Sequence, residues 1–533
     1  MDNVKNSFSG QGSEFQQLQH QLRDRWQSSD QFDQDEHDIL VVPSVSVDQR
    51  ELLKVEGFLH YEERLLFSLI RLRNPYTRLI YVTAVPLPPI VIDYYLQLLP
   101  GIPFSHARDR LLLFSTYDAS LKPLSQKILE RPRLMKRIRQ ALRPGKSYMS
   151  CYNSTNLERE ISLKLNLPLL APDPDLLYWG TKSGSRQIFA DSGVPHPDGS
   201  QLVWSVDDLV EATAELWYRQ PQLNKIVIKL NEGFSGEGNA ILDLKPLSEV
   251  GPGNVSHAQT VAALKEKIVH LRFQASGETW ESYSSRIPQL GAIAEAFIHG
   301  EKKRSPSVQA YITPHGEVKI LSTHDQILGG PDGQIYLGCR FPADPGYRLQ
   351  LQDWGVRVGQ TLAEKGAIER YGVDFVAVHQ PDRGTWDLQA IEINLRKGGT
   401  THPFMTLKYM TNGRYDLSTG LFFSQQGQPK HYIATDNLQK ESYRGLMPND
   451  LMDIIAYHQL HFDSSTKTGT VFHLMGTLSE FGKLGLTSIG DSPQQAEEIY
   501  NQVVRVLDLE TKSDQDANIP VSHPSLPITW NRE

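Results

Sequence analysis

The fold is decided by the stretch from Lys225 to Ala240, which reads KIVIKLNEGFSGEGNA. A short β-branched run holds Lys229 near its end, a glycine-rich loop follows, and a second apolar run begins at Ala240. A strand, a loop and a strand of this kind can fold over a polyphosphate, because glycines let backbone N–H groups approach the oxygens and the lysine supplies positive charge. The stretch lacks the GxxxxGK[ST] pattern of a P-loop. An ordinary hairpin turn explains the stretch better when it is taken alone, so the surrounding chain must decide.

Composition limits the class of protein. The chain has 533 residues, a net charge of −8 and 39% hydrophobic residues, which predicts a globular protein of about three domains. The acidic balance argues against nucleic acid or an anionic membrane as partner. Cys151 and Cys339 are too few for a disulfide framework and suit a reducing compartment. No apolar run approaches the roughly 18 residues of a membrane span, so we expect a cytoplasmic protein.

Periodicity predicts the domain order. Between residues 36 and 175, short apolar runs alternate with helical patterns, one of them a long basic helix over 124–142, which is typical of a parallel sheet covered by helices. The polar N-terminus predicts a mobile tail with a short helix around Phe15–Trp26. The predicted organisation is a disordered tail (1–35), an α/β domain (36–175), a nucleotide-binding domain (176–425) and a small α+β domain (426–533).

An acidic hairpin offers ligands for a metal ion. Glu392 and Asn394 are two positions apart on a predicted strand, so both side chains point to one face. Asp374 lies on the preceding strand and could face them. Two carboxylates and an amide oxygen are hard ligands that suit Mg²⁺ holding phosphate oxygens. The alternative is the polar outer face of an antiparallel sheet.

Two lysines accompany this hairpin. Lys182 precedes a predicted helix and the turn at Gly193-Val194-Pro195, and Lys229 lies directly before the glycine loop. Each lysine alone is more simply explained as solvated. Two lysines, a glycine loop and a metal-like hairpin in this order are hard to produce by accident.

With these motifs, residues from about 176 to 424 resemble an ATP-grasp domain, the nucleotide-binding fold of carboxylate–amine ligases. The resemblance implies that Lys182 and Lys229 bind ATP, that the glycine loop is a lid over its phosphates, and that Mg²⁺, as two ions, is held by the acidic hairpin. It also implies a hinge that meets the adenine near Ala296–Ile298 and a ribose contact from Glu301. The site residues so implied are Lys182, Lys229, Gly233, Ser235, Gly236, Gly238, Glu295, Ala296, Ile298 and Glu301 for ATP, Asp374, Glu392 and Asn394 for the metal, and Arg396 and Arg340 as catalytic arginines.

Most of the chain resembles the family of the pheganomycin peptide ligase. The stretches that carry this resemblance are Trp179–Arg186, Glu392–Pro403 and Val471–Gly490. It implies a pre-ATP-grasp domain, an ATP-grasp domain and a small C-terminal domain. The implied activity is ATP-dependent amide formation between a small-molecule or peptide carboxylate and an amine, through an acyl phosphate. A homo-oligomer is compatible with it.

Some features depart from the family pattern. The hinge is followed by a long basic segment, Glu301-Lys302-Lys303-Arg304, and Gly372 stands where many amide-forming relatives carry an arginine. His402 is a further candidate for substrate contact.

Two other readings stay open, namely a regulatory ATP-binding protein without turnover and a different ATP-grasp chemistry such as carboxyphosphate formation.

Overall fold

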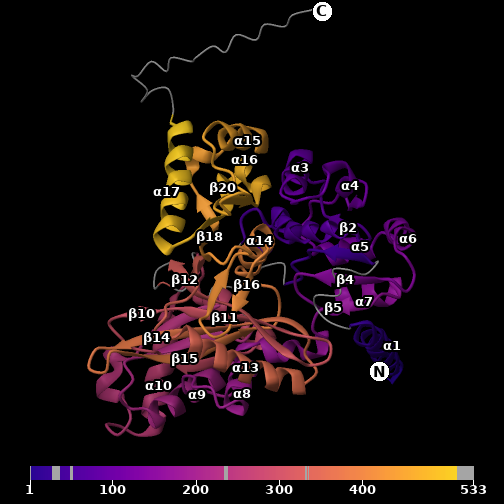
Figure 1. Cartoon of the computed structure of the whole chain (residues 1–533). Coiled ribbons are helices and arrows are strands. Elements are labelled where there is room, and N and C mark those ends of the chain that lie inside the picture. Colours follow the sequence, from indigo (N-terminus) through magenta and orange to yellow (C-terminus); the bar gives the residue numbers. More distant parts are fainter. Residues whose placement is uncertain are drawn as a thin grey trace, which may run out of the picture.

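Three sheets form the framework of the described part of the protein (Figure 1). The computed structural model describes residues 2–26, 37–47, 52–53, 55–232, 238–275, 277–329, 333 and 335–512. A parallel sheet of five strands belongs to the N-terminal region, and two antiparallel sheets of four and eleven strands follow. The predicted mixture of α/β and α+β architecture is therefore confirmed.

The N-terminal sheet has the strand order β3-β2-β1-β4-β5. Its strands β1 and β2 are mostly buried and apolar, as expected for a parallel sheet with helices on its faces, whereas the edge strand β3 is partly exposed. The strands of this sheet are β1 (Asp38–Val42), β2 (Arg78–Thr83), β3 (Leu111–Ser115), β4 (Ser147–Cys151) and β5 (Leu169–Leu170). The connecting helices are η2 (Phe58–Arg73), α3 (Pro89–Gln97), α4 (Phe104–Arg108), α5 (Leu124–Leu129), α6 (Pro132–Ala141) and α7 (Asn156–Leu165). The single helix predicted over 124–142 is wrong, because Pro132 starts a new helix and restricts the residue before it.

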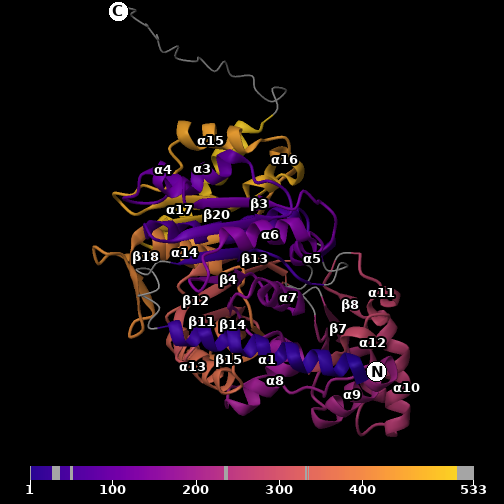
Figure 2. The ribbon, with the colours of Figure 1, turned by 90° about the vertical axis from the view of Figure 1, so that its right-hand side faces the viewer.

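The N-terminus is helical, which agrees with the short helix expected around Phe15–Trp26, whereas the expected disordered tail does not describe residues 2–26. Helix α1 spans Asp2–Arg25 and lies beside α7 (Figure 2). It also contacts β5. It buries an apolar stripe at helical spacing that consists of Phe15, Leu18, Leu22 and Trp26. Arg23 donates a hydrogen bond to the carbonyl oxygen of Pro314 at 3.1 Å, so the helix also contacts the central region.

The four-stranded sheet has the order β8-β7-β6-β9 and contains the stretch that opened the sequence analysis. Its strands are β6 (Lys225–Leu230), β7 (Asn239–Asp243), β8 (Arg272–Phe273) and β9 (Ala292–Ala296). The helices before and around it are η3 (Pro174–Gly180), α8 (Lys182–Asp191), α9 (Val206–Arg219), η4 (Lys245–Val250), α10 (His257–Lys267), η5 (Ile268–His270), α11 (Trp280–Ser284) and α12 (Ile287–Leu290). Ser205 caps α9 by accepting a hydrogen bond from the Asp208 N–H.

The eleven-stranded sheet joins the central and C-terminal regions. Its strands are β10 (Lys303–Arg304), β11 (Pro306–Ile312), β12 (Val318–Gly329), β13 (Ile335–Phe341), β14 (Glu369–Gln380), β15 (Thr385–Asn394), β16 (Arg414–Asp416), β17 (Leu421–Phe423), β18 (Pro429–Gln439), β19 (Gly469–His473) and β20 (Lys483–Gly490). The associated helices are α13 (Arg348–Glu364), α14 (Thr401–Thr411), η6 (Glu441–Tyr443), α15 (Pro448–Tyr457), η7 (Met475–Thr477), α16 (Leu478–Phe481) and α17 (Pro493–Glu510). Strand β18 pairs with β13 on one side and with β17 and β20 on the other. The expected boundary at 425/426 therefore falls between hydrogen-bonded neighbours of one sheet.

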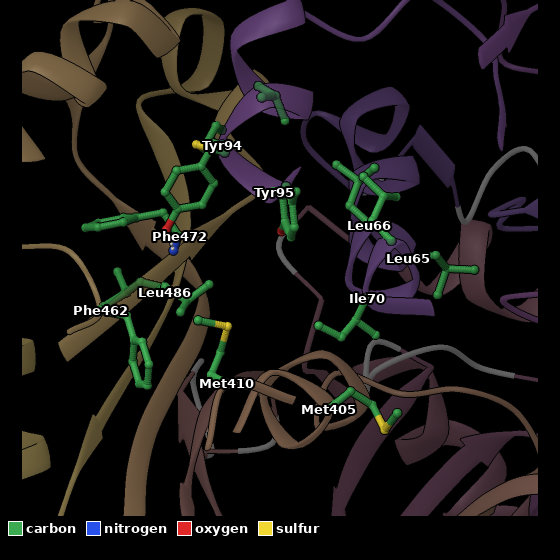
Figure 3. Packing of buried hydrophobic residues seen from close by; sticks show 14 of the residues in the cluster. Leu65, Leu66, Ile70, Tyr94, Tyr95, Met405, Met410, Phe462, Phe472 and Leu486 are labelled. Carbon is green, nitrogen blue, oxygen red and sulfur yellow. Dashed lines mark hydrogen bonds between the residues drawn. The ribbon is translucent and has the colours of Figure 1, made fainter. Parts of the chain in front are cut away.

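A shared core ties the N-terminal and C-terminal regions together (Figure 3). Leu65, Leu66 and Ile70 of η2 belong to the same buried cluster as Met405 of α14 and Phe472 of β19. The backbone N–H of Phe472 donates to the Tyr94 hydroxyl at 3.0 Å. No helix in the described ranges is both long and apolar enough to cross a lipid bilayer.

Candidate functional site

A cavity of about 830 Å³ lies where the two antiparallel sheets meet the N-terminal region. Its walls come from β6, β7 and β9 of the smaller sheet and from β11 to β15 of the larger one, and Arg64 and Tyr152 add a wall from the N-terminal region. The predicted residues that line it are Lys229, Glu295, Ala296, Ile298, Arg340, Asp374, Glu392, Asn394 and Arg396. Most of the predicted set therefore faces one space.

The acidic hairpin is β14–β15. Asp374 pairs directly with Glu392, and Gly372 pairs with Asn394, so the three polar side chains share one face. A bulge follows Asp374, because Phe375 pairs with Ala390 and leaves one extra residue on β15. The Asn394 amide donates to Asp374 at 2.9 Å.

The charges of this face suit a divalent cation. Burial, together with the nearby negative charge of Glu392, raises the pKa of Asp374 to about 7. A bound dication would remove this like-charge repulsion, and two carboxylates with one amide oxygen are ligands that Mg²⁺ accepts. Among the described residues no group of three or more His, Cys, Asp and Glu side chains could hold a metal ion, so the candidate magnesium site depends on two carboxylates and Asn394.

Lys182 reaches this hairpin from the start of α8. Its Nζ lies 2.5 Å from Oε1 of Glu392. Burial alone would raise the pKa of Glu392, but Lys182 outweighs it and the pKa is lowered. Helix α8 is fixed there by Ser185, whose hydroxyl accepts a hydrogen bond from the Ile393 N–H at 2.9 Å. A side chain at Gly184 would place its Cβ 1.9 Å from the Tyr178 carbonyl oxygen, so this close approach requires glycine.

Lys229 forms a second ion pair on the opposite wall. Its Nζ lies 2.5 Å from Oε2 of Glu295 on the neighbouring strand β9. Asn231 follows β6 directly. Its side-chain oxygen accepts a hydrogen bond from the Ser183 N–H at 2.9 Å, and its backbone carbonyl accepts one from the Lys182 N–H at 3.1 Å. One asparagine therefore couples the two lysine-bearing segments.

The predicted hinge follows β9. Ala296, Phe297 and Ile298 line the cavity, as an adenine-binding segment should. Glu301 is exposed and is not part of the cavity wall, whereas Lys303 and Arg304 of β10 are. The ribose contact assigned to Glu301 is therefore not supported by its position.

The glycine loop is only partly described. Gly233, Ser235 and Gly236 lie outside the described residues. Gly238 is described, and its carbonyl accepts hydrogen bonds from the Leu230 N–H at 2.9 Å and the Tyr283 hydroxyl at 3.0 Å. This end of the loop is firmly attached to β6.

The two candidate arginines differ in their surroundings. Arg396 lies beside the acidic hairpin, where its positive charge acts on both Asp374 and Glu392. Arg340 is half-exposed, and its Nη2 lies 3.1 Å from Glu497 of α17. Of the two candidate arginines, Arg396 is therefore the one that lies beside the acidic hairpin.

The sequence did not reveal several polar residues of the wall. Gln326 donates to Asp374 at 2.6 Å, and Arg64 of η2 and Tyr152 after β4 come from the N-terminal region. His402, expected as a substrate contact, lies outside the wall, buried, with its Nε2 3.1 Å from the Tyr95 hydroxyl. No local motif surrounds Arg64 or Tyr152, so only the tertiary structure brings them to the site.

Comparison with known families agrees with this geometry. A family described as "IQCH-like, ATP-grasp" matches residues 176–418, which contain both lysines and the acidic hairpin. The central region of the chain therefore has the ATP-grasp fold. A second family, described as "PGM1 C-terminal domain", matches residues 450–503 beyond the ATP-grasp domain.

Two curated relatives extend the similarity over most of the chain. L-propargylglycine–L-glutamate ligase of Streptantibioticus cattleyicolor is 29% identical over 468 residues, which cover 86% of this chain and 91% of the relative. IQ motif-containing protein H of Danio rerio is 24% identical over 507 residues. The aligned region covers 86% of this chain but only 47% of the Danio rerio protein. The predicted resemblance to a pheganomycin-type ATP-grasp ligase is confirmed.

Solved ATP-grasp structures have the same overall fold. The biotin carboxylase domain of Hydrogenobacter thermophilus 2-oxoglutarate carboxylase superposes with a TM-score of 0.52 at 13% identity, covering 90% of this chain and 94% of that one. Biotin carboxylase of Campylobacter jejuni gives a TM-score of 0.51 at 12% identity, covering 91% and 97%. At such low identity these likenesses concern the fold alone.

Proposed function

We propose that this protein is an ATP-dependent carboxylate–amine ligase that forms an amide bond and releases ADP and phosphate. The observation that carries the proposal is the convergence on one cavity of Lys229, Asp374, Glu392 and Arg396, with Lys182 paired to Glu392. This arrangement concentrates positive charge and metal-type ligands where a nucleoside triphosphate and a carboxylate can meet.

The chemistry follows from the weakness of a carboxylate as an electrophile. A carboxylate oxygen attacks the γ-phosphorus, the bond to the β,γ-bridging oxygen breaks, and ADP leaves. The amine then attacks the carbonyl carbon of the acyl phosphate, the C–O bond to phosphate breaks, and the amine nitrogen releases one proton. The protein has to neutralise charge, align the reactants and exclude water.

Each residue of the site has a part in this scheme. Lys182 and Lys229 neutralise phosphate oxygens, and Arg396 holds the reacting carboxylate or the oxygens of the transferred phosphoryl group. Asp374, Glu392 and Asn394 would hold Mg²⁺, as two ions, and the bound metal would neutralise charge on the phosphates. The segment around Ala296–Ile298 receives the adenine, and the glycine loop covers the phosphates.

The substrates are proposed to be amino acids or small peptides. The Streptantibioticus cattleyicolor relative is named for two amino acids, L-propargylglycine and L-glutamate. Amino acids are therefore the first acids and amines to try. Self-association and a cytoplasmic location stay proposals.

The test is to incubate the purified protein with ATP, Mg²⁺ and pools of amino acids and dipeptides. Substrate-dependent ADP release, and hydroxamate formation when hydroxylamine replaces the amine, would support the ligase. ATP binding without turnover across all pools would favour the regulatory alternative. Bicarbonate-dependent ADP release without an amide product would favour carboxyphosphate chemistry.

A further inference from the structure

One end of the cavity has no role in the scheme so far. It is formed by Arg64 of η2, Tyr152 directly after β4, Arg396 directly after β15, and residues 398–400, which lead into α14. Three separate segments of the fold therefore meet at this end.

Two guanidinium groups lie against the same aromatic ring there. The Cζ of Arg64 is 5.7 Å from the centre of the Tyr152 ring, and the Cζ of Arg396 is 5.8 Å from it. Arg64 also donates from Nη1 to the Tyr152 hydroxyl at 3.1 Å. The Cζ atoms of Arg64 and Arg396 are thus no farther apart than the sum of these two distances. A molecule the size of one amino acid can bridge this span.

Arg64 is supported from behind by a buried polar chain. Its Nη2 donates to Asp436, whose other oxygen lies 2.7 Å from Nε2 of His473. The His473 ring lies against the His402 ring, with 4.1 Å between ring centres and an angle of 31° between the ring planes. Burial opposes the charge of Arg64, but Asp436 outweighs it and raises the pKa, so the guanidinium is charged. Buried charged groups are costly unless they are well paired, and this chain orients one edge of Arg64 toward the cavity.

The segment that follows β15 and carries Arg396 is also held in place. The backbone N–H of Lys397 donates to the Tyr152 carbonyl at 3.2 Å, and its Nζ donates to the Cys151 carbonyl at 2.7 Å. A Cβ at Gly399 would come within 2.8 Å of the Tyr336 ring. The segment after β15 is therefore fastened to the end of β4, and the positions of Arg396 and Tyr152 depend on each other.

We propose that Arg64 binds a second, non-reacting carboxylate of the acid substrate, while Arg396 faces the carboxylate that is phosphorylated. The inference rests on the proposed ligase function and names the substrate class: amino acids or small peptides that carry two carboxylates. A planar guanidinium recognises a carboxylate with two parallel hydrogen bonds, which an amide cannot accept equally well. Asp436 and Tyr152 act as positioning residues for Arg64.

The direct test measures binding to the full chain saturated with Mg²⁺ and a non-hydrolysable ATP analogue. Calorimetric titrations use L-aspartate, L-glutamate and L-α-aminoadipate, with L-asparagine and L-glutamine as probes in which one carboxylate is an amide. At least one diacid should bind about 10-fold more tightly than its amide. Arg64→Gln should abolish that preference and leave amide binding unchanged. Arg73→Gln, on the same element but outside the cavity wall, should keep it.

Two further variants make the result independent of one substitution. Tyr152→Phe keeps the ring and removes the hydroxyl that accepts from Arg64, so the diacid preference should fall by about 3-fold. Asp436→Asn should weaken diacid binding more than amide binding. Equal affinity of wild type for diacids and amides, absence of diacid binding, or an undiminished preference in Arg64→Gln would overturn the inference.

Measurements of turnover can distinguish a failure of this inference from a failure of the proposed ligase function. If ADP and hydroxamate form equally well with monocarboxylic amino acids, and Arg64→Gln does not change their kcat/KM, the ligase stands and the inference falls. If diacid binding depends on Arg64 but no ADP is released with any amine, the inference stands and the ligase proposal fails.

Discussion

Lys182 and Glu392 are 210 positions apart in the chain, yet Nζ of the lysine lies 2.5 Å from Oε1 of the glutamate. Only 3% of the Lys182 side chain is exposed. The two groups neutralise each other in this state, and each is proposed to take a different partner in the reaction, phosphate for the lysine and metal for the glutamate. Binding of ATP with Mg²⁺ would therefore compete with this ion pair.

Replacing Lys182 with methionine should abolish turnover and destabilise the protein. Loss of one partner leaves Glu392 as a buried charge without its cation, which typically costs about 3 kcal/mol. ADP release and urea unfolding would measure the two effects. The double variant Lys182→Met/Glu392→Gln should regain most of the stability but none of the activity. Normal turnover in Lys182→Met would contradict the site.

Lys229→Ala should lower turnover by at least about 100-fold, because one proposed phosphate contact is lost. Circular dichroism should show an intact fold. Glu295→Gln keeps the side-chain volume and the lysine, so its loss should be smaller. An equal loss in both variants would mean that the ion pair itself, rather than the lysine, is required.

Chelation of divalent cations should stop substrate-dependent ADP release, and Mg²⁺ should restore it. Asp374→Asn should raise the Mg²⁺ concentration needed for half-maximal activity, because a charged ligand becomes neutral. Gln326→Leu removes only the hydrogen bond to Asp374 and serves as the milder comparison. A Mg²⁺ requirement that is unchanged in Asp374→Asn would place the metal elsewhere.

Stability should fall as pH rises from about 4.5 to 8, in part because of Glu63. Burial raises the pKa of this carboxyl group to about 8. Its protonated form is favoured in the folded protein, so its contribution is complete below the ordinary pKa and is lost as pH rises through the raised pKa. Glu63→Gln keeps an oxygen for the Gly476 N–H, which donates to Glu63 at 3.0 Å. The unfolding free energy of this variant should vary less over that range. An unchanged pH profile would contradict the assignment.

Phe15→Ala should destabilise the protein by about 3 kcal/mol, because a fully buried aromatic ring is lost. The ring also lies 5.3 Å from the guanidinium carbon of Arg159. Glu14→Ala, at an exposed position of the same helix, is the control and should change stability little. Similar unfolding midpoints for both variants would show that α1 adds nothing to stability.

The sequence predicted those parts of the site that depend on local spacing. Glu392 and Asn394 share a face because strand side chains alternate, and the glycine loop identifies Lys229. Arg64 could not be found this way, because its place at the cavity depends on contacts between separate sheets. The sequence predicted only the C-terminal part of α1, since Phe15 and its apolar neighbours have helical spacing but stand among many polar residues. The pairing of β18 with β13 depends on long-range register, which local composition does not encode.

The continuous pairing of β13, β18 and β20 has a mechanical consequence. A hydrogen-bonded sheet cannot bend sharply between adjacent strands without breaking its ladder, so the C-terminal region and the acidic hairpin move as one body. The four-stranded sheet has no strand pairing with the larger sheet in the described part of the chain. We therefore expect this sheet to be the part that can tilt, and a tilt would move Lys229 relative to Asp374 and Glu392.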